Sequence, residues 1–168
     1  MTQPKQKHTL RDHGMINLRI PIDPPPTHQA ALRILKNSSG NMFVGKQSNS
    51  KAAKWAKQFA TSLKNYKPSS PLDGAVRLTV TFAYPLLKKH DGKREVLAKI
   101  TRPDCDNLVK IVLDVLVKEG FILDDSRIVF LNIYKVHHVN GPFVDIMATT
   151  EVPNPWVRPD GTNALLEE

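Results

Sequence analysis

Hydrophobic and polar residues alternate along several stretches of the chain, and this period of two predicts β-strands. Residues 15–22 alternate in this way and end close to Pro24, which supplies no backbone N–H to a sheet. Residues 75–84 give the clearest alternation, with Val, Leu, Val, Phe and Tyr set against Arg and Thr. Residues 32–35 and 42–44 flank an Asn-Ser-Ser-Gly sequence and predict a strand–turn–strand.

Two other stretches repeat apolar residues at the spacing of a helix, so each predicts an amphipathic helix. The first covers residues 50–66, and its apolar face consists of Ala52, Trp55, Ala56, Phe59, Leu63 and Tyr66. The second covers residues 107–119, and its apolar face consists of Leu108, Ile111, Val112, Val115 and Leu116. Gly120 stands where a left-handed residue is expected to end the second helix.

Residues 127–136 are almost continuously apolar, which favours a central strand covered on both faces or the seam of a dimer. Asn140 and Gly141 signal a hairpin, so residues 143–149 are expected to be the partner strand. Together the patterns predict an α+β fold, in which a mixed or antiparallel sheet of about five strands carries two main helices.

Length and composition favour one domain. The chain has 168 residues, of which 40% are apolar, and this is enough to bury a core. We place that domain at residues 15–150. Residues 1–14 are polar and basic and are expected to form a mobile arm. Residues 151–168 contain prolines and end in acids, so we interpret them as an extension outside the core.

Charge and cysteine content narrow the classes of partner and compartment. A net charge of +8 favours a polyanionic partner, of which nucleic acid is the commonest. The single cysteine excludes an internal disulfide and fits a reducing cytosol. No stretch is apolar and long enough to cross a membrane, and the N-terminus lacks a signal-peptide core. We therefore expect a cytoplasmic protein with no membrane partner.

Four acidic residues lie at the two ends of the second predicted helix. Asp104 and Asp106 precede it and, in an extended segment, would leave the same side of the backbone. Asp106 or Asn107 is suited to cap the helix. The helix would be roughly 19 Å long, and residues 120–125 span roughly 20 Å when extended. If they double back along the helix, Asp125 reaches the other acids.

Such a meeting of carboxylates suits one kind of chemistry. Carboxylate oxygens are hard ligands that suit Mg²⁺ or Mn²⁺, and such an ion polarises a bound phosphate. Lys110, one turn inside the helix, is placed to stabilise charge on that phosphate. Each piece alone is commonly a helix cap, a turn or a solvated charge. Their combination predicts a divalent-metal site that cuts nucleic-acid phosphodiesters.

One contiguous stretch resembles the signature of the RusA family of Holliday junction resolvases. The matching residues are Asp104-x-Asp106-Asn107-x-x-Lys110, then Asp114, Leu116, Gly120 and Asp124-Asp125-Ser126. The resemblance implies a Mg²⁺-dependent homodimeric endonuclease that nicks four-way DNA junctions in pairs during recombination and repair. A junction has near two-fold symmetry, and a symmetric dimer supplies the two opposed sites that it needs.

The resemblance also implies roles for individual residues. Asp104, Asp106 and Asp125 would be the essential carboxylates and hold the metal, and Lys110 would be the catalytic lysine. Asn107 and Asp124 would support them.

A basic segment, residues 86–102, leads directly into Asp104 and is where we expect the DNA backbone to bind. Its positive charges are Lys88, Lys89, Lys93, Arg94, Lys99 and Arg102. If roughly six phosphates are neutralised, binding should weaken with salt with a log–log slope near about −5.

Two other classes of function fit the same residues. One is a different metal-dependent nuclease that acts on branched DNA, such as flaps or forks, or on RNA. The other is a non-catalytic junction-binding protein that uses the acids only as a helix cap and a turn.

Overall fold

The computed structural model describes residues 14–26, 32–46, 51–88 and 95–151. The predicted arm, except Gly14, and the predicted C-terminal extension, except Glu151, lie outside the described residues. Within them, no helix is long and apolar enough to span a bilayer.

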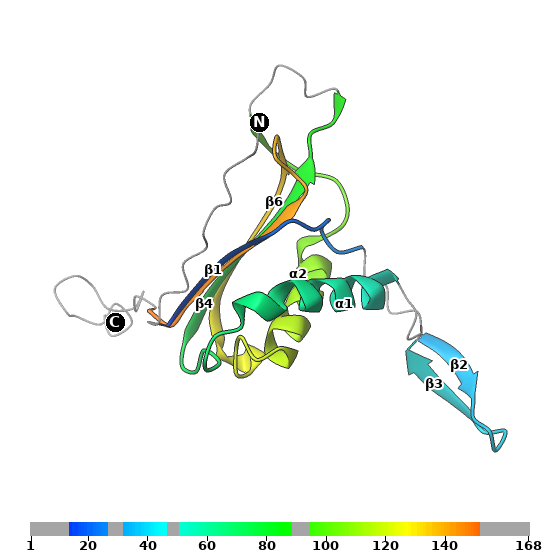
Figure 1. The fold of residues 1–168 in the computed structure, drawn as a ribbon. Coiled ribbons are helices and arrows are strands. Elements are labelled where there is room, and N and C mark those ends of the chain that lie inside the picture. The colour runs from blue at the N-terminus through cyan, green and yellow to red at the C-terminus, as the bar shows by residue number, and fades with distance from the viewer. Residues whose placement is uncertain (1–13, 27–31, 47–50, 89–94, 152–168) are drawn as a thin grey trace, which may run out of the picture.

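The described chain forms two sheets and two main helices (Figure 1). The elements follow one another as β1 (Met15–Ile20), β2 (Leu32–Lys36), β3 (Met42–Lys46), α1 (Lys51–Leu63), the 3₁₀ turn η1 (Lys64–Tyr66), β4 (Val76–Pro85), β5 (Val96–Ala98), α2 (Cys105–Lys118), the 3₁₀ turn η3 (Asp125–Arg127), β6 (Ile128–His138) and β7 (Phe143–Thr149).

The larger sheet has five strands in the order β1-β7-β4-β6-β5. Strands β4 and β6 run parallel, and the other neighbouring pairs are antiparallel. The predicted α+β class, with a mixed five-stranded sheet and two helices, is confirmed. Strands β2 and β3 form the predicted strand–turn–strand, which is a separate hairpin that projects away from the larger sheet (Figure 1).

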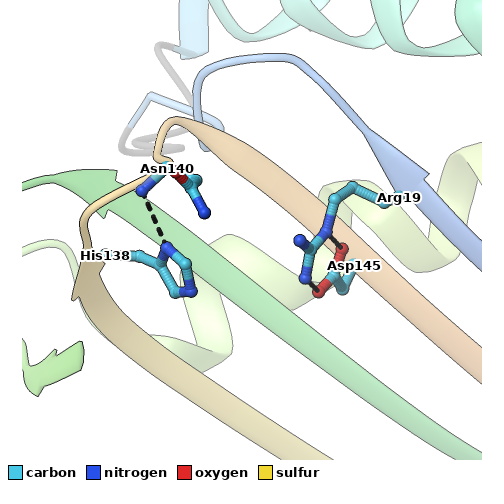
Figure 2. Close-up of polar contacts among 4 residues, drawn as sticks. All are labelled: Arg19, His138, Asn140 and Asp145. Carbon is cyan, nitrogen blue, oxygen red and sulfur yellow. Dashed lines mark hydrogen bonds and ion pairs between the residues drawn. The ribbon is translucent and has the colours of Figure 1, made fainter. Parts of the chain in front are cut away.

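The core lies between one face of the sheet and the two helices. Alternate residues of β4, from Val76 to Phe82, are fully buried, as their period of two requires. Helix α1 contacts β1 and helix α2 contacts β6, so both helices cover the same face (Figure 1). The opposite face is held together by side-chain pairs such as Arg19 and Asp145, whose oxygens accept hydrogen bonds of 2.7 and 2.6 Å (Figure 2).

Helix α2 begins earlier than the sequence predicts. Its N-cap is Asp104, in extended backbone with φ −79° and ψ 150°, and the backbone N–H of Leu108 donates to the Asp104 carbonyl at 3.2 Å. The expectation that Asp106 or Asn107 caps the helix is therefore wrong, and Asp106 lies in the first turn. The predicted end is confirmed, because Gly120 has φ +75°, a conformation that a residue with Cβ rarely adopts.

The predicted hairpin between β6 and β7 is wrong, because β4 lies between these two strands. The turn itself forms as expected, and the backbone N–H of Asn140 donates to His138 Nδ1 at 2.9 Å (Figure 2). The chain then crosses the end of β4. A Cβ on Gly141 would lie 2.7 Å from the carbonyl oxygen of Tyr84, so only glycine allows this crossing.

Strand β6 is also less covered than its apolar sequence suggests. Short β5 pairs only with residues 136–138, so no described strand borders the earlier part of that edge. Val129, Leu131 and Tyr134 are 55%, 41% and 55% exposed. The expectation of a strand covered on both faces is therefore wrong, and the alternative of a dimer seam stays a prediction.

Candidate functional site

The first acidic pair lies at the exposed start of α2. Asp104 makes no capping hydrogen bond with its side chain, so its carboxylate is not consumed by the helix end. Asp106 and Lys110 are both exposed and lie one turn apart on the same face of the helix. Carboxylates near a helix N-terminus are stabilised by the helix dipole. Two carboxylates and an ammonium are therefore all exposed within the first two turns of α2 and its N-cap.

The position of this pair depends on a residue of β6. The Nζ atom of Lys135 donates to the carbonyl oxygen of Thr101 at 2.8 Å and to that of Pro103 at 2.5 Å. The backbone N–H of Lys99 also donates to the carbonyl of Lys135, at 2.9 Å. The loop that leads into Asp104 is thereby attached to β6 by hydrogen bonds to both the side chain and the backbone of Lys135.

Two further side chains pack behind this loop. Lys99 Nζ hydrogen-bonds Thr101 Oγ1 and lies 4.9 Å from the centre of the Tyr84 ring. Burial, and then the charge of Lys135, lower the pKa of Lys99. Burial, and then the nearby Cys105, raise the pKa of Tyr84 to about 12. The buried hydroxyl of Tyr84 finds no hydrogen-bond partner in the part of the chain that the structure describes.

The second acidic pair lies in a short turn before β6. Asp124 is the N-cap of η3, and its Oδ1 accepts the backbone N–H of Ser126 at 2.9 Å. Hydrogen bonds from Ser126 hold the pKa of Asp124 below its usual value. Arg127 forms an ion pair with Asp73 at 3.3 Å, which ties the turn to the loop before β4. Asp125 is exposed and is the first residue of η3.

The two pairs are far apart within one chain. After Gly120 the chain does not double back along α2; it first pairs with the loop before β4, where Leu72 and Ile122 form a parallel bridge. Strand β6 then leads the chain back toward the start of α2. Asp125 precedes Ile128, whereas Asp104 lies beside Lys135, and the stretch between them spans about 23 Å at about 3.3 Å per residue.

The expected meeting of Asp104, Asp106 and Asp125 in one chain is therefore wrong. No group of three His, Cys, Asp or Glu residues suited to a metal occurs within the described ranges, and these contain all the predicted ligands. The error lies in the path of residues 120–125. The assignment of the residues themselves stays a prediction.

The basic segment before the site is only partly described. Lys88 and Arg102 are exposed, and Lys99 is half-buried against the loop. Lys89, Lys93 and Arg94 lie outside the described residues. The segment contains β5, which was not predicted because three residues are too few to show a period. Lys135 was also not predicted from the sequence. The feature that could have identified it is a single charged residue inside an apolar strand.

Comparisons with known proteins place the chain in a family. The family model described as endodeoxyribonuclease RusA matches residues 21–149, which is most of the chain. A relative from Lactococcus phage r1t, described as crossover junction endodeoxyribonuclease rusA, is 42% identical over 62 residues. That match covers 37% of this chain and 45% of the relative, so it spans less than half of the relative's length. The chain belongs to the RusA endodeoxyribonuclease family.

Proposed function

We propose that this protein is a Mg²⁺-dependent endodeoxyribonuclease that resolves four-way DNA junctions by paired nicks in recombination and repair. The observation that carries the proposal is the exposed carboxylate pair at the start of α2, with Lys110 one turn further, in a chain of the RusA family. The net charge of +8 favours a DNA partner, and such a substrate together with a single cysteine favours action in the cytoplasm.

The donor atoms fit Mg²⁺, with Mn²⁺ as an alternative, but one chain is short of ligands. Asp104 and Asp106 supply hard carboxylate oxygens at an open position, as such ions prefer. No third acid joins them from the described part of the same chain. We therefore propose that the third carboxylate, Asp125, comes from a second copy of the chain.

The part of the β6 edge before residue 136, which no described strand borders and which we call the bare edge, offers a way to bring Asp125 in. An uncovered strand edge with apolar side chains is a template for pairing with another chain. If two β6 edges pair antiparallel about a two-fold axis, the start of one strand lies beside the end of the other. Asp125 of the partner subunit would then approach the end of β6 where Asp104 and Asp106 stand. The homodimer would hold two such sites, as paired nicking requires.

Each residue would have a distinct task in cleavage. A bound divalent cation would polarise the phosphodiester and lower the pKa of an attacking water. Asp104, Asp106 and the partner's Asp125 would hold it and fix its place against the phosphate. Lys110 would stabilise negative charge on the phosphate or on the leaving oxygen. The exposed Lys88 and Arg102, with the rest of the basic segment, would bind the DNA backbone.

The test is a cleavage assay on a labelled four-way junction beside a linear duplex of the same arm sequence. The proposal expects symmetric nicks in the junction with Mg²⁺, none with EDTA, and little cutting of the duplex. Equal cutting of flaps or forks, or of RNA, would indicate a different metal nuclease. Tight junction binding with no cleavage in Mg²⁺ or Mn²⁺ would indicate a non-catalytic binding protein.

A further inference from the structure

We propose that Lys135 is a positioning residue for the carboxylate pair. It would act through the loop that it fastens, and it need not touch DNA or the metal. The inference rests on the proposed function, because it assigns a task within that site. Neither the apolar pattern nor the signature residues point to this lysine.

The contacts of Lys135 favour such a role. Its ammonium donates to two backbone carbonyls, those of Thr101 and Pro103, although it stands 34 and 32 residues away in the sequence. Pro103 directly precedes Asp104, so one of the two bonds ends next to the first carboxylate. A loop held at both carbonyls has few alternative conformations, and this lowers the entropy cost of holding two acids ready for an ion.

The surroundings show that the lysine is not an ordinary solvated charge. Lys135 is half-buried, on the helix-facing side of β6, level with the fully buried Phe82 of β4. Removing a charged group from water costs free energy unless it is hydrogen-bonded, and here two carbonyls supply that compensation. Its charge also contributes to the lowered pKa of Lys99, which packs against the same loop.

A second step follows from the strand that carries the residue. Strand β6 holds Lys135 near one end, and its other end directly follows the turn with Asp125. In the proposed dimer, Lys135 of one chain and Asp125 of the other would therefore be held by two paired copies of β6. Outer partners of metal ligands typically contribute about 10- to 100-fold in affinity or activity. We expect Lys135 to contribute within that range.

The experiment compares Lys135→Met, Lys135→Gln and Lys135→Arg with the wild-type chain. Lys118→Met, at the exposed far end of α2, is the matched control for removal of a lysine. Mn²⁺ binding without DNA is measured by electron paramagnetic resonance. Junction cleavage is measured across a range of Mg²⁺ concentrations, and junction binding is measured in Ca²⁺. Hydrogen exchange of residues 101–108 reports the loop directly, and thermal unfolding reports the fold.

The proposal expects Lys135→Met to weaken Mn²⁺ binding and raise the half-saturating Mg²⁺ concentration by about 10-fold or more. Junction binding in Ca²⁺ should be kept, and exchange in the loop should be faster. Lys135→Arg, which can donate to both carbonyls, should stay within about threefold of wild type. Lys118→Met should match wild type. If Lys135→Met does not fold, Lys135→Gln, which also lacks the charge but keeps a polar end, serves for the same comparison.

Two results would overturn the inference while leaving the proposed function intact. One is a Lys135→Met chain whose metal dependence equals that of wild type. The other is a variant that loses thermal stability alone, with an unchanged Mg²⁺ requirement, which would make the lysine merely structural. If the wild-type chain itself neither binds Mn²⁺ nor cleaves junctions, the proposed function fails, and the inference fails with it.

Discussion

The two acidic segments of this chain differ in what shapes them. The start of α2 is positioned by contacts from residues distant in the sequence, because Lys135 reaches the carbonyls of Thr101 and Pro103 across more than 30 residues. The turn before β6 takes its shape locally, because Asp124 accepts the N–H of Ser126 two residues away, although Arg127 also pairs with the distant Asp73. One segment thus depends on the assembled sheet, whereas the other would form its turn from its own sequence.

This difference bears on how a metal site could be built. A locally formed turn can present Asp125 to any neighbour that comes close, including a second chain. A loop fastened to the sheet keeps Asp104 and Asp106 in one place. In the proposed dimer, the first pair is the fixed part of each site and the partner's Asp125 is the part that completes it.

The largest expected effect comes from neutralising one acid of the fixed pair, Asp104 and Asp106. Asp106→Asn should lower the rate of junction cleavage by more than about 100-fold, since a ligand is expected to contribute more than its supporting residues. Junction binding should be kept or improved, because repulsion of the DNA phosphates is reduced. Cleavage and binding are measured on the same labelled junction.

A matched control for this change lies on the same helix. Glu119→Gln removes one acidic charge at the other end of α2, and it should leave cleavage near the wild-type rate. Equal cleavage by Asp106→Asn and the wild-type chain would mean that the acids serve only as a cap and a turn.

The next largest effect concerns the β6 edge, where two copies of the chain would pair and bring their acidic segments together. Leu131→Lys places a charge in the middle of the bare β6 edge, where two copies would face each other. We expect this variant to be monomeric by light scattering coupled to size exclusion and to lose cleavage, although every predicted ligand is intact. The wild-type chain should be a dimer in the same measurement.

Met147→Lys is the matched control, because Met147 is 49% exposed and Leu131 is 41% exposed. Met147 lies on β7, inside the sheet, and its substitution should leave the dimer intact. A dimer that persists in Leu131→Lys and is lost in Met147→Lys would move the interface to the open face of the sheet.

The same contrast explains what could be predicted from the sequence. Strand β4 and the end of α2 at Gly120 could be predicted because short-range patterns determine them. The start of α2 was misplaced, because Asp104, Asp106 and Asn107 are all residues that can cap a helix. The sequence nearby does not show that the distant Lys135 donates to the carbonyl just before Asp104. The β6–β7 hairpin was wrong for a similar reason: Asn140 and Gly141 fix a turn but not the strand that lies between its arms.

The spatial relation between Asp125 and Asp104 could not be predicted from the sequence. Chain length allowed Asp125 to reach Asp104, but the pairing of Leu72 with Ile122 sends the chain the other way before β6 returns. No pattern within residues 104–125 encodes that contact.

The smallest expected effect probes the packing behind the fixed pair. Because the folded chain keeps the Tyr84 proton up to about pH 12 and the unfolded chain releases it near pH 10.0, stability should fall as the pH rises through this window. Allowing for a partly exposed ring, the loss should be about 1 kcal/mol. Tyr84→Phe should remove that part of the pH dependence, as measured by urea unfolding at pH 9 to 11.

At neutral pH, Tyr84→Phe should be as stable as wild type or slightly more so, because it deletes a buried hydroxyl without a partner in the described chain. A clear loss of stability at neutral pH would show that the hydroxyl is hydrogen-bonded after all.

Complementation between two inactive variants tests most directly whether the site is shared by two chains. Asp104→Asn and Asp125→Asn are each expected to be inactive as homodimers. After the two are unfolded together and refolded, about half of the dimers are mixed, and each mixed dimer has one site with all three carboxylates. Nicking should then return to about a quarter of the wild-type level. If the mixture stays as inactive as either variant while mixed dimers are shown to form, each site belongs to a single chain.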